Sequence, residues 1–319
     1  MGVSARHILQ QGPVLSALAR TAYLAARQRI APGDAPAAAP EGPGPAFQRT
    51  AQPLPRGLID DYVRFLGGDA RAYRGEVPPH LFPQWCMPAF ARTLEDVPYP
   101  LLRVLNGGCR VRVNGRLPDN EPLQVRARLM GIDDNGSRAV LHQHAFTGPR
   151  GQPDALEIDL YAIVPLGGRN GHGAAPHDGG GARAGDGAKA RARERPRVPE
   201  HAHEVLRTRL RADAGLGFAK LTGDFNPIHW LQPYARASGF PSVILHGFGT
   251  FAFAWEGLHR GLFGGDVHAL SSFDAKFARA LALPHEVGLY VHDQHVFVAD
   301  APGGPAYLTG TFASRGNQP

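Results

Sequence analysis

A carboxylate and an imidazole stand five residues apart in the second half of the chain. Asp224 and His229 belong to the stretch Leu-Thr-Gly-Asp-Phe-Asn-Pro-Ile-His, which ends at His229. Asn226 and Pro227 lie between them and favour a turn. A turn can aim both side chains at one point, whereas a continuous strand or helix would set them by its own period. Such a pair can hold one water molecule and act on it as general acid and base.

A second motif, Val-Ile-Leu-His-Gly-Phe, follows at residues 243–248. We expect a helix to begin near His246, and the free N–H groups at a helix start stabilise developing negative charge. The Gly247 N–H is therefore the candidate oxyanion donor. Together these groups suit the hydration of a conjugated thioester, in which water adds at Cβ and a proton reaches Cα. This chemistry requires neither a metal nor a redox cofactor, so we expect no cofactor.

The two motifs resemble the signature of the MaoC-like, R-specific enoyl-CoA hydratase 2 family. Residues 272–279, Ser-Phe-Asp-Ala-Lys-Phe-Ala-Arg, are similar to a later strand of that family, and the clear match covers residues 216–290. The resemblance implies that Asp224 and His229 are the catalytic pair and that the Gly247 amide is the oxyanion donor. It also implies R stereochemistry and a hotdog fold, in which an antiparallel sheet wraps a long helix.

The remaining polar residues of the motifs have structural interpretations beside functional ones. Asn226 is expected to form the turn that orients the pair, and His246 to support the helix entry, while both stay candidates for substrate binding. Asp224, His229 and His246 could also ligate a metal. No His-x-His or His-Glu-x-x-His motif accompanies them, so we expect no metal there.

Two further histidines, His142 and His144, are spaced so that they share one face of a predicted strand. The sequence shows neither an acid partner nor a third ligand for them. We therefore expect exposed strand histidines.

The apolar periodicity and the turn residues predict two successive sets of helices and strands. In the first set, helices are expected at 59–66 and 81–94, and strands at 108–113, 123–132, 138–147 and 155–165. In the second, a strand is expected at 205–210, helices at 213–221 and 246–262, and strands at 270–277, 286–298 and 305–314.

The two sets of elements share a local sequence echo. The first set contains Gly-Asp at Asp69, an aromatic residue at Tyr73 and a helix entry at His80, and these parallel the motif around Asp224. The first copy has no histidine in register. We interpret this as a diverged duplication in which only the second copy is catalytic. Two-hotdog members of the family often keep one active half. The fold expected is α+β, a double hotdog with both sheets joined edge to edge.

The predicted segments run along the chain in the following order. They are a basic N-terminal helix at 1–30, an Ala/Pro/Gly linker at 31–52, a degenerate hotdog at 53–166, a disordered basic Gly/Ala/Arg linker at 167–200 and a catalytic hotdog at 201–319. The helix at 1–30 places Leu9, Leu15 and Leu18 near helical spacing, and we expect it to lie on the rest of the protein.

The net charge of +6 comes from two segments. Residues 1–30 contain four arginines and no acid, and residues 169–200 contain seven Lys or Arg against four acids, so the remainder is close to neutral. This distribution argues against nucleic-acid binding. No apolar run is long enough for stable membrane insertion. Two cysteines without a disulfide pattern fit a cytoplasmic protein.

The expected partner is an acyl thioester of coenzyme A or of acyl carrier protein, and a homodimer is compatible with this arrangement. Two other functions stay open. A hotdog thioesterase would direct water at the thioester carbonyl and release a free thiol. A non-catalytic acyl-binding subunit would tolerate the loss of Asp224.

Overall fold

The computed structural model describes residues 2–30, 42–100, 104–166 and 195–316. In the first half the elements are η1 (Ala5–Gln11), α1 (Gly12–Ile30), β1 (Phe47–Ala51), α2 (Arg56–Phe65), η3 (Ala70–Tyr73), η4 (Pro79–Leu81), α3 (Pro83–Arg92), β2 (Leu105–Val113), β3 (Leu123–Asp134), β4 (Arg138–Gly148) and β5 (Leu156–Pro165). In the second half they are β6 (His203–Leu210), α4 (Ala214–Thr222), η6 (Pro227–His229), α5 (Gln232–Ala237), β7 (Ile244–Leu245), α6 (Gly247–Gly261), β8 (Leu270–Phe277), β9 (Leu281–Ala282), β10 (His285–His292), β11 (His295–Ala299) and β12 (Ala306–Ser314).

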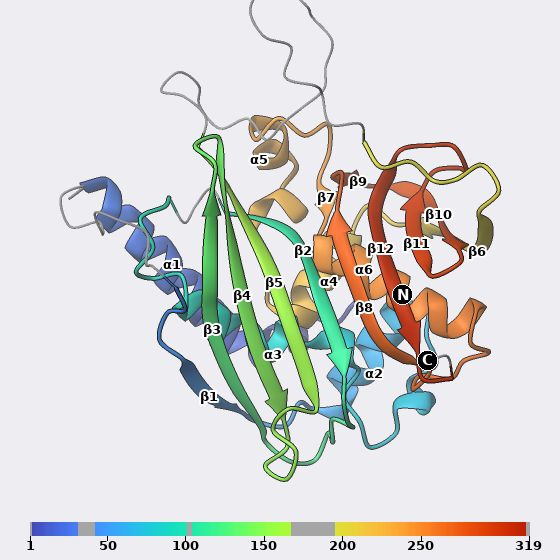
Figure 1. Ribbon diagram of the computed structural model, residues 1–319, viewed down its shortest axis with the longest axis horizontal. Helices are drawn as coiled ribbons and strands as arrows, with labels where there is room; N and C mark the ends of the chain where they lie inside the picture. The colour runs from blue at the N-terminus through green and yellow to red at the C-terminus, as the bar shows by residue number, and fades with distance from the viewer. Residues whose placement is uncertain (1, 31–41, 101–103, 167–194, 317–319) are drawn as a thin grey trace, which may run out of the picture.

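Ten of these strands form one antiparallel sheet in the order β1-β3-β4-β5-β2-β8-β12-β11-β10-β6. The first five come from the first half of the chain and the last five from the second, in mirrored order. Figure 1 shows α2, α3, α4 and α6 behind this sheet, and no described helix covers its other face. The mirrored strand order agrees with the predicted duplication.

The two halves meet where β2 pairs with β8. Arg110 of β2 lies opposite Asp274 of β8, and its guanidinium donates hydrogen bonds of 2.9 and 2.7 Å to the Asp274 carboxylate. Backbone pairing and this charged contact therefore join the halves edge to edge, as the double-hotdog expectation requires.

The core lies between the sheet and the two central helices, α3 and α6. Alternation along β3 places every second side chain from Leu123 to Leu129 inside. On α6, Phe251 and Trp255 are fully buried and pack against Phe273 of β8. Burial of each such side chain contributes roughly 1.5–3 kcal/mol, so α6 is anchored firmly and its N-terminus has a fixed position.

Most predicted elements occur where the sequence places them, with three corrections. Residues 286–298 are not one strand, because a turn at Asp293, with φ of 52°, divides them into the hairpin β10–β11. Within the predicted linker 31–52, residues 47–51 form β1, which pairs with β3 at the sheet edge. Within the predicted linker 167–200, Val198 is buried and its N–H donates to Gly304 O. Residues 31–41 and 167–194 lie outside the described residues.

The N-terminal segment packs on the rest of the protein as expected, with α1 against α3 and η1 against α4. The face that it turns inward differs from the predicted one. Gln11 and Val14 are buried, whereas Leu9 is 84% exposed and Leu18 is 40% exposed. The Gln11 side chain donates to Lys220 O on α4, and Gln84 of α3 donates to Gln11. Polar contacts with two helices thus decide its orientation, rather than the leucine spacing.

Within the described ranges, no helix has both the length and the apolar character needed to cross a bilayer.

Candidate active site

The loop that carries Asp224 is shaped by its neighbours on both sides. Helix α4 ends at Gly223, whose φ of 86° favours glycine. The next turn is organised by Asn226, whose side-chain oxygen accepts the Ile228 N–H at 3.3 Å and caps η6. This capping contact agrees with the predicted turn-forming role of Asn226, and the turn carries His229 at its end.

The His229 ring is held in one orientation by the backbone of β7. Its Nδ1 lies 2.8 Å from Ile244 O. Because a carbonyl can only accept, Nδ1 carries the hydrogen in the neutral ring and Nε2 keeps a free lone pair. Burial lowers the pKa of His229, although Asp224 opposes that effect. The imidazole is therefore neutral near pH 7 and ready to accept a proton.

His246 stacks on His229, with ring centroids 3.5 Å apart. Its Nε2 donates to the Asp224 carbonyl at 2.9 Å, so it ties the loop to the start of α6. Burial lowers the pKa of His246 to about 3. The His246 side chain is 1% exposed, so it is packed inside the protein and supports the His229 ring by stacking on it.

Asp224 and His229 come together across the turn. One carboxylate oxygen of Asp224 and one nitrogen each of His229 and His246 all lie within 4.8 Å of one another. A water accepting or donating two hydrogen bonds bridges groups about 4.6 Å apart. The Asp224 side chain is 41% exposed, so solvent water reaches its carboxylate.

Gly247 is the first residue of α6, and its N–H lies at a helix N-terminus where no intrahelical partner exists. A Cβ at this position would come within 2.7 Å of the Phe277 ring. Phe277 also packs edge-on against Phe248. A side chain at this position would therefore have to displace Phe277 or the start of α6.

A second glycine, Gly215 of α4, allows the backbone of His229 to pack closely against α4. A Cβ added there would overlap the His229 carbonyl oxygen. We expect Gly215→Ala to displace the imidazole and to lower kcat roughly a hundredfold, as misplacement of a catalytic group by about 1 Å can do. Gly151→Ala is the matched control, because nothing lies within 4 Å of its added Cβ. An unchanged kcat in Gly215→Ala would contradict this role.

The buried neutral His246 makes folding sensitive to acid. A histidine whose folded pKa is about 3, against 6.5 when unfolded, stabilises the folded state fully above pH 6.5 and progressively less as the pH falls toward 3. We expect it to remove about 2 kcal/mol of unfolding free energy between pH 7 and pH 5. Urea unfolding of wild type and His246→Phe at both pH values measures this contribution. An identical pH dependence in the two proteins would disprove it.

The first half places different chemistry at the equivalent position. Asp69 points to solvent and is bound by Arg71, while Tyr73 and His80 are buried. The Tyr73 hydroxyl donates to Glu256 Oε2 at 2.8 Å and lies 3.2 Å from His80 Nε2. Glu256 comes from α6, so these buried contacts join residues of both halves of the chain.

Two further side chains complete the buried cluster. Tyr62 lies 3.1 Å from His80 Nδ1, and His259 Nδ1 lies 3.1 Å from the Tyr73 hydroxyl. Burial opposes ionisation of Glu256, but the hydrogen bond from His80 and further contacts hold its pKa below the ordinary value. Burial lowers the pKa of His259 to about 4, so this ring is neutral. We call Tyr62, Tyr73, His80, Glu256 and His259 the buried cluster.

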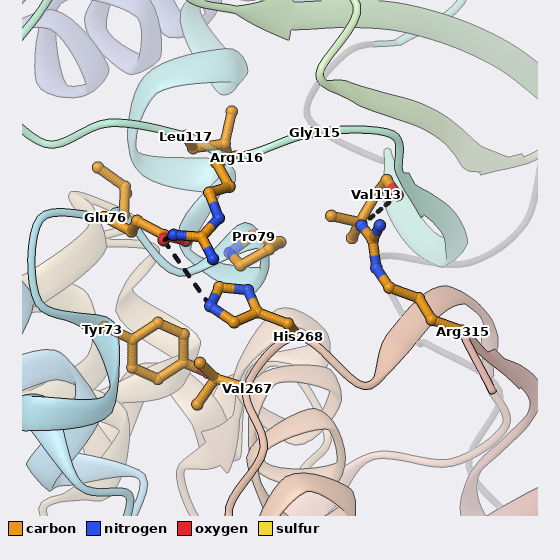
Figure 2. Close-up of a pocket in the computed structure, with 11 residues that line it drawn as sticks. Tyr73, Glu76, Pro79, Val113, Gly115, Arg116, Leu117, Val267, His268 and Arg315 are labelled. Carbon is orange, nitrogen blue, oxygen red and sulfur yellow. Dashed lines mark hydrogen bonds and ion pairs between the residues drawn. The ribbon is translucent and has the colours of Figure 1, made fainter.

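A pocket of about 190 Å³ is lined by Tyr73, Glu76 and Arg116 among other residues. Figure 2 shows these side chains around it. Arg116 and His268 approach Glu76 there at 2.8 and 3.7 Å, and Arg315 donates to the Val113 carbonyl. None of Asp224, His229 or Gly247 lines it. The pocket therefore lies beside Tyr73 and not at the Asp224–His229 pair.

The structure corrects the expectation for His142 and His144. Both rings contact Asp159 of β5, at 2.7 and 2.9 Å, so they do have an acid partner. The partner is invisible in sequence because it depends on the register between β4 and β5. The contacts that support His229, from Ile244 and Gly215, also gave no sequence signal.

Comparison with known proteins identifies the class. Residues 194–296 match the family model described as MaoC like domain. HtdX of Mycobacterium tuberculosis superposes with a TM-score of 0.63 at 16% identity, covering 85% of this chain and all of that one. Another M. tuberculosis protein, described as having a double hotdog fold, gives 0.54 at 15% identity over 86% of this chain and 96% of its own. The fold is thus a double hotdog, and its second half is the part that matches the MaoC like domain.

Sequence relatives have hydratase and dehydratase names. The 3-hydroxyacyl-thioester dehydratase Y of M. tuberculosis is 28% identical over 61% of this chain and 63% of its own length. The peroxisomal enoyl-CoA hydratase 2 of Arabidopsis thaliana is 24% identical over 54% and 55%, respectively. The matched region thus spans less than two thirds of these relatives.

Proposed function

We propose that the protein is a hydro-lyase that interconverts trans-2-enoyl and (R)-3-hydroxyacyl thioesters, with Asp224 and His229 as its acid–base pair. The observation that carries this proposal is the convergence of Asp224 and neutral His229 at a separation that one water can bridge, with Gly247 next to the clustered His246 at the start of α6. The names of the relatives and the MaoC-like domain support the same reaction.

In the hydration direction, His229 Nε2 takes one proton from the water while the water oxygen bonds to Cβ. The second O–H of that water donates a hydrogen bond to the Asp224 carboxylate and stays on the oxygen as the product hydroxyl. The Cα–Cβ π electrons move toward the thioester carbonyl, and the carbonyl oxygen accepts a hydrogen bond from the Gly247 N–H. The imidazolium of His229 then returns a proton to Cα. Each group acts where charge develops, which is the requirement for lowering the barrier.

The first test is the loss of enoyl-thioester absorbance with the full chain, using crotonyl-CoA, longer trans-2-enoyl-CoA substrates and the matching acyl carrier protein thioesters. We expect saturable hydration, with (R)-3-hydroxyacyl product on chiral chromatography. If folded protein leaves all of these substrates unchanged, the proposal fails. Release of free thiol from saturated acyl thioesters would then support the thioesterase alternative.

A further inference from the structure

The open face of the sheet carries a histidine–carboxylate cluster on β4 and β5 that has no part in the proposed hydration. His144 lies directly opposite Asp159 in the register of the two strands. Glu157 is two residues from Asp159 and therefore projects from the same face. The strand pairing thus brings an imidazole and two carboxylates to one patch.

The three side chains are close enough to share a ligand. His144 Nδ1 lies 2.9 Å from Asp159 Oδ1, and His144 Nε2 lies 3.9 Å from Glu157 Oε1. One ring nitrogen and one oxygen from each carboxylate fall within 4.8 Å of one another. A tetrahedral ion with bonds of 2.0–2.1 Å separates its ligands by about 3.3 Å, so small side-chain rotations suffice.

Neighbouring side chains already orient these groups. His142 Nε2 approaches the same Asp159 oxygen at 2.7 Å, and its ring stacks on Tyr161 at 5.0 Å. Arg112 holds Glu157 at 2.8 Å. The Asp159 side chain is only 9% exposed. Hydrogen bonds to ligating carboxylates and limited solvent access are what strengthen protein metal sites.

We propose that His144, Glu157 and Asp159 bind one divalent transition-metal ion such as Zn²⁺, with His142 orienting Asp159. Imidazole nitrogen together with carboxylate oxygen selects this class over Mg²⁺ or Ca²⁺. Three protein ligands leave a coordination position toward the sheet face that no described helix covers (Figure 1). The nearby Arg110 is hydrogen-bonded to Asp274, whereas Arg112 donates to Glu157 Oε1 and shares that carboxylate with the ion.

A second possible metal position is formed by Asp224, His229 and His246, whose ligand atoms meet the same spacing. There, however, His229 Nδ1 and His246 Nε2 each contact a backbone carbonyl. His201 and His292 form another surface pair at 3.3 Å. The experiment must therefore distinguish metal binding at His144 from binding at His229 and from binding at His201.

Calorimetric titration of the chelator-treated full chain with Zn²⁺ gives the affinity and stoichiometry, and Co²⁺ absorbance reports the ligand set. We expect one ion per chain in wild type. His144→Gln is expected to lower the affinity a hundredfold or more, and His142→Gln about ten- to a hundredfold. His229→Gln and His201→Gln are the matched controls and should bind as wild type does.

Folding of each variant is checked by its melting temperature without metal, and bound Zn²⁺ should raise that temperature in wild type but not in His144→Gln. Three results would overturn the site. They are no saturable binding by wild type, unchanged binding by His144→Gln, or loss of binding in His229→Gln or His201→Gln.

Discussion

Asp224→Asn and His229→Gln are each expected to lower kcat/KM for enoyl-thioester hydration at least a hundredfold, in the range that removal of a general acid or base produces. Asn keeps the size of Asp but cannot hold the water as a charged acceptor. The amide of Gln is not basic enough to take up a proton near neutral pH, so the proton of the attacking water has no acceptor. Both proteins should keep wild-type far-ultraviolet circular dichroism, since Asp224 is partly exposed and Gln fills most of the imidazole volume.

Two further variants test whether Asp224 and His229 act as one unit and whether the first half contributes to catalysis. Because the pair acts on one water, the double variant should be little worse than the weaker single variant. Asp69→Asn, the equivalent change in the first half, should leave kcat/KM near wild type, because Asp69 faces solvent against Arg71. Less than a tenfold loss in both single variants would remove the pair from the mechanism.

Glu256→Ala should lower the free energy of unfolding by about 3–5 kcal/mol, as expected when one member of a buried charged network is removed. The substitution leaves the buried Tyr73 and His80 without their shared acceptor, and it leaves a cavity where the buried Glu256 side chain was packed. Urea unfolding measures the loss.

The matched control for this change is Glu286→Ala. Its carboxylate is 57% exposed and lies 3.8 Å from Arg207, so about 0–1 kcal/mol is expected. If Glu256→Ala costs no more than the control, the buried cluster does not hold the halves together.

Much of the fold could be predicted because local pattern and packing agree. Helix α6 and strand β8 occur where the apolar periodicity places them. The short elements α5, β7 and β9 gave no such signal, since two to six residues cannot show a period. The β10–β11 turn interrupts the predicted strand 286–298, although the polar residues His-Asp-Gln-His at 292–295 do mark it in the sequence.

The candidate site was predictable as a set of residue types but not as a geometry. The turn around Asn226 could be inferred from Asn-Pro, and its capping bond is present. The contacts from Ile244, His246 and Gly215 depend on how distant elements pack. Glu256 and Tyr73 are separated by 183 residues, so their contact could come only from the three-dimensional structure.

The continuous pairing of β2 with β8 has an evolutionary consequence. In a symmetric pair of identical subunits, every substitution is made twice, so a change that improves one site also alters its copy. Joining the two hotdogs in one chain removes that constraint. Glu256 could enter the counterpart of the site, and Tyr73 could close it, while the surroundings of Asp224 stayed unchanged. Covalent linkage thus allows one half to specialise in holding the molecule together while the other keeps the chemistry.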